Sequence, residues 1–300
     1  MLSTKAAILT AEVMEHDRAD LLEPVLGNRR AGILCAVPGT DGRVRPRVRR
    51  ESVSDLVTCG AVLRETETKE ADKILTVLTP DHGRISVIAR GARRKSCRFA
   101  AACQTLAYSE LTLTHRGDWY YLNEGTTRAL FDGLRTDFEA LALGFYFAEL
   151  TEAVSSPEIP APELLSHLLN GLYALDTLKK PRELAKPAFE LRLMSLAGYE
   201  PLADGCAVCG AADPADARLD PVQGVLRCAA CGGPSPGLPL GPGALAALRH
   251  IVYGDPARLY AFRLEGAGAK QLYAAAERYV CAQLERGFRT LDYYRSLTKA

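Results

Sequence analysis

Four cysteines in two C-x-x-C pairs are the side chains of this sequence best suited to metal chemistry. Cys206 and Cys209 form the first pair, and Cys228 and Cys231 form the second after 18 intervening residues. This spacing is typical of zinc sites, in which each pair directs two thiolates toward one tetrahedral centre. Four thiolates fill the coordination sphere of zinc, so we expect one structural Zn²⁺ with no open position for a reactive water. A redox pair, or cysteines that are simply buried, is the alternative.

A basic segment is the second feature with a defined chemistry. It contains six cations and no acidic residue, and no acidic residue follows before Glu110. The six cations are Arg84, Arg90, Arg93, Arg94, Lys95 and Arg98. Such a segment can follow a nucleic-acid backbone, because each neutralised phosphate releases condensed counterions. The charge alone is equally compatible with a solvated loop.

Aromatic residues lie close to this basic segment in the sequence, and unpaired bases stack on such rings. They are Phe99, Tyr108, Trp119, Tyr120 and Tyr121. Aromatic residues on strands more often pack in a core, so we expect only about two of them to be exposed.

The elements that must position these residues change in type along the chain. Between residues 54 and 133, short β-rich segments alternate with turn signals. The predicted strands are 57–63, 74–78, 85–89, 105–114 and 119–122. Five short strands with hairpin-like spacing favour a small closed barrel, of which the OB-fold is a common five-stranded form.

From about Leu134 the apolar residues recur at spacings of three and four, which indicates helices. The helical patterns cover residues 134–148, 164–175, 189–197, 245–252 and 272–284. The predicted fold class is therefore α+β, with an N-terminal OB-fold barrel at residues 54–133 and an α-helical domain at residues 134–300. A four-cysteine zinc finger is inserted in that helical domain at residues 204–235.

Composition and targeting signals limit the class of protein further. No apolar run approaches the roughly 20 residues that span a bilayer, and the N-terminus lacks the order of a secretory signal. The chain has nine cysteines, an odd number, and four of them form the two pairs, which favours reduced thiols. We expect a cytoplasmic, nucleoid-associated protein that does not contact a membrane.

Several short motifs follow one another in a specific order. Gly-Ala-Val-Leu-Arg at 60–64 and Glu-Ala-Asp-Lys-Ile at 70–74 precede a longer motif at 82–99 that contains the basic segment. Residues 188–193 and 196–199 then lead directly to the C-x-x-C pairs. In this order and spacing, over about residues 54–300, the chain resembles the bacterial recombination mediator family RecO.

The resemblance implies an activity without catalytic residues. RecO proteins bind single- and double-stranded DNA and anneal complementary strands. With RecR, and often RecF, they load RecA onto DNA coated by single-strand-binding protein. The resemblance assigns DNA contacts to Arg90, Arg93, Arg94, Lys95 and Arg98, and it assigns the zinc site to the four cysteines. It also implies that the helical domain binds the acidic tail of single-strand-binding protein, for which Lys186 and Arg192 are the nearby candidates.

The first 53 residues depart from the family, whose members begin shortly before the first strand. We expect this extension to be mostly unordered, with a basic run from Arg43 to Arg50. Val53 stands where a family member has its initiator methionine, and valine can be encoded by the start codon GTG. We therefore hypothesise that translation begins at Val53. A basic tail that binds DNA is the rival interpretation.

Two other classes of function remain as alternatives. An enzyme is disfavoured because the histidines have no ligand or triad spacing, and because the glycine-rich run 266–270 lacks the spacing of a phosphate loop. The histidines are His16, His82, His115, His167 and His250. The other alternative is a zinc-ribbon adaptor that binds protein partners without DNA.

Overall fold

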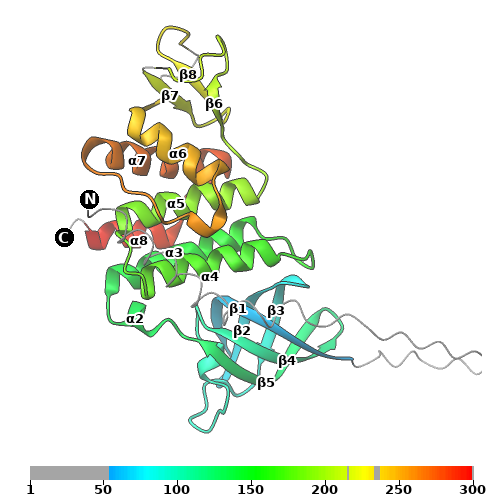
Figure 1. Cartoon of the computed structure of the whole chain (residues 1–300). Helices are drawn as coiled ribbons and strands as arrows, with labels where there is room; N and C mark the ends of the chain where they lie inside the picture. The colour runs from blue at the N-terminus through cyan, green and yellow to red at the C-terminus, as the bar shows by residue number, and fades with distance from the viewer. Residues whose placement is uncertain (1–53, 215, 233–236, 299–300) are drawn as a thin grey trace, which may run out of the picture. The chain divides into compact units, whose positions relative to one another are not determined.

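The structure is a computed structural model that describes residues 54–214, 216–232 and 237–298 (Figure 1). The N-terminal extension, including the predicted basic run and the proposed start at Val53, lies outside the described residues. None of the helices in the described ranges is both long and apolar enough to cross a membrane.

Five strands form a closed barrel in the order β1-β2-β3-β5-β4. Their bounds are β1 Ser54–Thr68, β2 Asp72–Thr79, β3 Gly83–Ala89, β4 Tyr108–Arg116 and β5 Trp119–Ala129. Neighbouring strands are antiparallel except β3 and β5, which are parallel and pair Val87 with Tyr120. Pairing of β1 with β4 closes the barrel, so no strand edge is left open there.

The interior of the barrel follows from alternation of side chains along the strands. On β3, buried and more exposed residues alternate along the whole strand. Leu75, Val77, Val87, Leu111 and Leu113 are completely buried in one apolar cluster. The short helix η2, Ala101–Cys103, adds Ala102 and Cys103 to that cluster and covers one end of it.

Helices follow the barrel along the chain. They are α2 Asp132–Arg135, α3 Phe138–Val154, α4 Pro162–Asp176 and α5 Arg182–Leu196 before the cysteines, then α6 Pro242–Tyr253, α7 Gly266–Gln283 and α8 Arg289–Thr298. The observed α+β fold, an OB barrel followed by helices with a four-cysteine insertion, confirms the predicted fold class.

One predicted helical face is partly wrong. The pattern from Leu134 to Ala148 was expected to be continuous, but the chain starts a new helix at Phe138. The carboxylate of Asp137 accepts hydrogen bonds from the backbone N–H groups of Glu139 and Ala140, which is the geometry of an N-cap. Phe138 consequently points outward with 78% of its surface exposed, and Leu143, Tyr146 and Phe147 form the buried face instead.

Apolar packing joins the barrel to the helices. Ala61, Leu63 and Leu78 lie on the outside of the barrel wall and belong to the same buried cluster as α3, α4 and α5. The contact is reinforced at Glu152 on α3, which accepts from Arg64 through its carboxylate and from Arg84 through its backbone carbonyl at 2.8 Å.

Candidate metal centre and nucleic-acid interface

The four cysteines are brought together by a small sheet inserted between α5 and α6. Its strands are β6 Leu202–Cys206, β7 Ala217–Asp220, β8 Val225–Cys228 and β9 Leu238–Leu240, in the order β6-β8-β7-β9. Cys206 ends β6 and Cys228 ends β8, and these two strands pair with each other. Each C-x-x-C sequence therefore turns at the end of a strand, and both turns lie at the same end of the sheet.

The turns aim their sulfurs at one point. The four Sγ atoms all lie within 4.8 Å of one another, and the Cys209 and Cys228 sulfurs are 3.8 Å apart. Gly210 and Gly232 follow the second cysteine of each pair with φ of +73° and +57°, a conformation that glycine adopts without strain. No other group of three or more His, Cys, Asp or Glu in the described ranges could hold a metal ion.

The electrostatics of the cluster suit a divalent cation. Backbone N–H groups of Cys209, Cys228 and Val208 point at the sulfur of Cys206 and lower the pKa of that thiol to about 6. Hydrogen bonds among the crowded sulfurs, first with Cys228 and then with Cys209, raise the pKa of Cys231 to about 12. A bound cation offsets the repulsion that opposes ionisation of all four thiols, and four sulfurs match the preference of zinc.

The sheet that carries the cysteines lies next to α6 and α7 and is hydrogen-bonded to both helices (Figure 1). The Arg249 guanidinium on α6 donates to the carbonyl of Ala203 at 2.7 Å, and the backbone N–H of Ala203 donates to the Tyr253 hydroxyl at 2.8 Å. On α7, the Gln283 amide donates to the carbonyl of Pro221 at 2.8 Å. Loss of order at the cysteines would therefore also weaken the hydrogen bonds between this sheet and the helices α6 and α7.

The basic segment leaves the barrel at the end of β3 and forms a loop over the turn between β1 and β2. The Gly91 N–H donates to the carboxylate of Asp72 at 2.7 Å, and the Arg93 N–H donates to the carbonyl of Ala71 at 3.0 Å. The methyl group of Ala92 is buried between these anchors. Sequence reasoning missed Asp72, because a single acidic residue beside a turn carries no signal of the loop it will hold.

The six predicted DNA-contacting cations are not equivalent in the structure. Arg84 lies inside β3, and its guanidinium donates to the Glu152 carbonyl, so it is occupied at the contact with α3. Arg93 pairs with Glu67 at 3.1 Å and donates to the carbonyl of Glu70. The remaining cations of the loop, Arg90, Arg94, Lys95 and Arg98, are exposed, and no carboxylate of the described ranges forms an ion pair with them.

The neighbouring aromatic residues divide between the two faces of the barrel wall. Tyr108 is buried, while Phe99 and Tyr120 pack against the barrel core. Trp119 is 40% exposed, and Tyr121 is half-buried beneath the Arg90 guanidinium, which lies 4.9 Å from the ring centre. Trp119 is thus the single exposed member of the set, one fewer than expected.

The two predicted partner-binding residues differ in their accessibility to a partner. The Lys186 ammonium is fully buried between the carboxylates of Glu190 and Glu277, at 2.8 and 3.0 Å. An incoming acidic peptide cannot reach this ammonium. Arg192 is half-buried, and its guanidinium donates to the carbonyl of Val252 at 2.7 Å.

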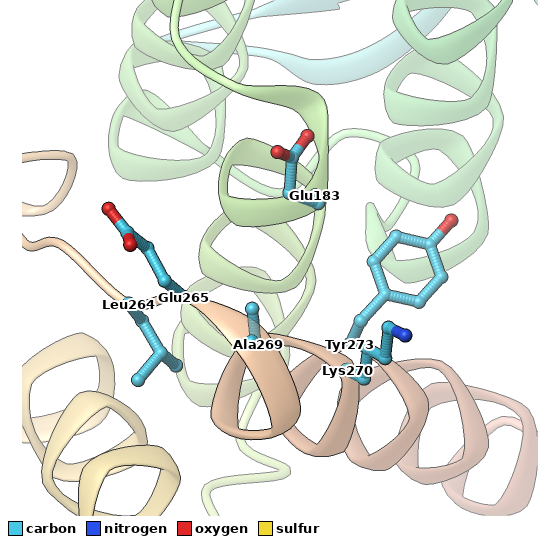
Figure 2. Close-up of a pocket in the computed structure, with 7 residues that line it drawn as sticks. Glu183, Leu264, Glu265, Ala269, Lys270 and Tyr273 are labelled. Atoms are coloured by element: carbon cyan, nitrogen blue, oxygen red, sulfur yellow. The ribbon is translucent and has the colours of Figure 1, made fainter.

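A pocket of about 430 Å³ opens where the first turns of α5 and α7 approach each other. Figure 2 shows Glu183 on α5 near the start of α7, which carries Ala269, Lys270 and Tyr273. Glu265 adds a second carboxylate to the wall. The glycine-rich run 266–270 forms the first turn of α7 at this pocket, where the carboxylates of Glu183 and Glu265 line the wall together with Lys270.

The barrel, its basic loop and the four-cysteine sheet together place the chain in the class of OB-fold proteins that carry an appended helical domain with a four-cysteine knuckle. The family models for recombination protein O match at both parts: the N-terminal model covers residues 54–131 and the C-terminal model covers residues 135–292. The chain belongs to the recombination protein O (RecO) family.

Individual relatives agree with this assignment. A DNA repair protein RecO from Acetivibrio thermocellus is 31% identical over 246 residues, which is 81% of this chain and 98% of that protein. The RecO protein of Symbiobacterium thermophilum is 32% identical over 247 residues, covering 80% and 97% of the two chains. The RecO protein of an Anaeromyxobacter species is 37% identical over 202 residues, covering 65% and 78%.

Proposed function

We propose that this protein is a DNA repair and recombination mediator that binds single- and double-stranded DNA and anneals complementary strands. In this role it helps RecR, with or without RecF, to load RecA onto DNA coated by single-strand-binding protein. Base pairing between the annealed strands supplies the driving force, so the protein needs no catalytic residue. Membership in the RecO family and the basic loop on an OB barrel support the proposal.

The observation that carries the DNA-binding part is the exposure of the loop cations. Arg90, Arg94, Lys95 and Arg98 project from one anchored loop, and Arg93 joins them at its edge. When such cations neutralise DNA phosphates, condensed counterions leave the DNA. Added salt opposes this release, so the affinity for DNA falls as the salt concentration rises. Arg84 is left out of this set because its guanidinium already donates to the Glu152 carbonyl.

The salt dependence of binding tests this assignment directly. Each phosphate contact on single-stranded DNA adds about −0.7 to the slope of log affinity against log salt. The triple variant Arg93→Ala, Arg94→Ala, Lys95→Ala should therefore flatten the slope by up to about 2 and weaken binding at low salt. A matched triple variant on the helices, Lys270→Ala, Arg278→Ala, Arg289→Ala, removes the same charge from exposed positions and should leave the slope unchanged.

The adaptor alternative separates from the mediator in the same measurement. A zinc-ribbon adaptor that binds only proteins gives no salt-dependent affinity for DNA with the intact chain. If the loop variant and the helical variant lose affinity equally, the effect is one of net charge and the loop is not the interface.

We propose that Cys206, Cys209, Cys228 and Cys231 hold one structural Zn²⁺. The ion would supply four metal–sulfur bonds that fix the two turns at the end of β6 and β8, and its filled coordination sphere leaves no place for a substrate. Arg218 and Arg227 are the basic residues between the pairs, and Arg227 faces Asp220 at 3.9 Å. That composition favours a structural role over direct phosphate binding.

The remaining parts of the proposal concern partners and place of action. RecR and the acidic tail of single-strand-binding protein are the expected partners, with RecA engaged indirectly, in the cytoplasm at the nucleoid. Arg192 is kept as a candidate contact for the tail. Strand annealing on DNA coated by single-strand-binding protein, with and without RecR, tests these interactions, and a nucleotide-hydrolysis assay tests the absence of catalysis.

A further inference from the structure

Trp119 begins β5 immediately after the two-residue turn that joins it to β4, and its ring is 40% exposed. An indole at the surface offers an aromatic face on which an unpaired base can stack. Alternation along β5 gives its direction: Tyr120 and Leu122 pack against the barrel core, so Trp119 and Tyr121 face outward together.

The neighbours of these two rings extend the outward face. Ile88 on β3 is the register partner of Tyr121, and Ile74 on β2 is the register partner of Ile88. Both isoleucines are partly exposed. On the other side of β5, the Thr114 hydroxyl of β4 donates to the Asp55 carboxylate of β1. The aromatic pair therefore lies between β3 and this negative charge.

The basic loop begins on the β3 side of the aromatic pair. Arg90 follows β3 directly, and its guanidinium lies over the Tyr121 ring at 4.9 Å from the centre. The outer surface therefore presents the exposed indole of Trp119, then the Tyr121 ring with the Arg90 guanidinium over it, and then the cations of residues 94–98. OB-folds that bind oligonucleotides use this region of the barrel, the face of strands 2 and 3 with the loops that join strands 1–2 and 4–5.

We propose that Trp119, with Tyr121 and Arg90, is a stacking platform for an unpaired base and makes the protein bind single-stranded DNA more tightly than double-stranded DNA. The inference rests on the proposed function, because it assumes that the basic loop binds the DNA backbone. Phosphates are present in both forms of DNA, so the loop cations attract both. A base face is available for stacking only when the base is not already stacked within a duplex.

The chain contains a single tryptophan, so its own fluorescence reports on Trp119 without any substitution. Binding of oligothymidylate should quench the indole emission and protect it from the neutral quencher acrylamide. Binding of a duplex, followed in parallel by anisotropy of a label on the DNA, should leave the emission and the acrylamide accessibility unchanged. Labelled DNA and indole emission are measured on the same full-length protein.

Substitution supplies the second measurement. Trp119→Ala should weaken single-stranded binding about 5- to 150-fold, the range found for one lost stacking contact, and should change duplex affinity less than about twofold. Its salt slope should equal that of the unaltered protein because no phosphate contact is removed. Trp119→Phe keeps an aromatic face and should retain most of the affinity.

The outcomes distinguish this inference from the function beneath it. If oligothymidylate binds while the indole emission stays unchanged and Trp119→Ala keeps full affinity, the platform is wrong and the mediator proposal stands. Equal losses for single-stranded and duplex DNA in Trp119→Ala also overturn the platform. Failure of the unaltered protein to bind either DNA overturns the mediator proposal and the platform with it.

Discussion

The ammonium of Lys186 lies 2.8 Å from the carboxylate of Glu190, one turn further along α5, and neither side chain is exposed. Glu277 on α7 approaches the same ammonium at 3.0 Å, so the cluster joins two helices through ionic contacts. The Tyr146 hydroxyl also donates to the Glu190 carboxylate, at 2.6 Å. Burial raises the pKa of Glu190. Burial also acts to raise the pKa of Glu277, but the nearby cations Lys186 and Arg295 outweigh this effect, so the pKa of Glu277 is lowered.

Removing one partner from this cluster should be costly. Lys186→Ala leaves the Glu190 carboxylate buried without its counter-charge, so we expect a loss of about 3–5 kcal/mol in the free energy of unfolding. Lys270→Ala, an exposed lysine at the start of α7, is the matched control and should change stability by less than about 0.5 kcal/mol. Urea unfolding measures the free energy of unfolding of both variants. Equal losses would show that the buried ion pair contributes no more to stability than an exposed lysine does.

A second buried group makes stability depend on pH. His167 on α4 stacks on Phe189 at 4.5 Å between ring centres, and its Nε2 lies 3.0 Å from the carbonyl of Phe189. Burial lowers the pKa of His167 to about 4, with Arg192 adding to the effect. The carbonyl can only accept, so the ring is neutral with its proton on Nε2 in the folded state.

The sign of the pH effect follows from this depressed pKa. Between its ordinary value near 6.5 and about 4, the unfolded chain takes up a proton that the folded chain does not, so stability is full above pH 6.5 and falls as pH decreases. The slope is at most about 1.4 kcal/mol per pH unit, or roughly 3 kcal/mol in all. The stability difference between the unaltered protein and His167→Gln, measured by urea unfolding at several pH values, isolates this group. A difference that stays constant from pH 7 to pH 4.5 would contradict the assignment.

Two glycines with similar backbone conformations should respond differently to alanine. Gly83 and Gly117 have φ of +56° and +59°. A Cβ on Gly83 would lie 2.1 Å from the carbonyl oxygen of Ile159, whereas a Cβ on Gly117 meets no atom within 4 Å. Gly117→Ala should cost about 1–2 kcal/mol from the left-handed backbone alone.

Gly83→Ala carries the same backbone cost and must also displace the chain at Ile159, where the segment after α3 touches the barrel. We expect it to cost about 1–3 kcal/mol more than Gly117→Ala, as overpacking does elsewhere. Thermal unfolding of the two variants side by side checks this. Equal midpoints would mean that the segment at Ile159 moves aside without cost.

Sequence patterns predicted the elements that depend on local periodicity. The five strands and the helices α4 and α5 follow directly from alternation and from spacings of three and four, and the C-x-x-C pairs specified a cluster that the fold does assemble. The helix α8 was missed, because its polar residues leave only Leu291 and Tyr294 buried.

What the sequence could not supply is the tertiary partner of each charged residue. Lys186 has the composition of a surface cation, and only the approach of α7 from 91 residues further along the chain turns it into a buried one. Arg84 belongs to the basic run in sequence, yet its position inside β3 directs it to Glu152 on α3. Whether a cation is available to DNA is therefore a property of packing, which no local pattern encodes.

The four cysteines provide the last prediction. Cys206→Ser removes one ligand from a sheet that is bonded to α6 and α7 through Ala203 and Pro221, so the loss should spread into the helical core. We expect the zinc content to fall below one per chain and the unfolding midpoint to fall by about 10 °C or more. Cys281→Ser, outside the cluster on α7, is the control and should keep its zinc.

The DNA affinity of Cys206→Ser should change much less than its stability when it is expressed per folded molecule. The cations that we assign to DNA project from the barrel loop at residues 90–98, and the barrel has a separate buried core. Elemental analysis, thermal unfolding and DNA anisotropy on the same preparation make the comparison. A variant that stays folded, holds no zinc and has specifically lost DNA binding would show that the knuckle, rather than the barrel, contacts DNA.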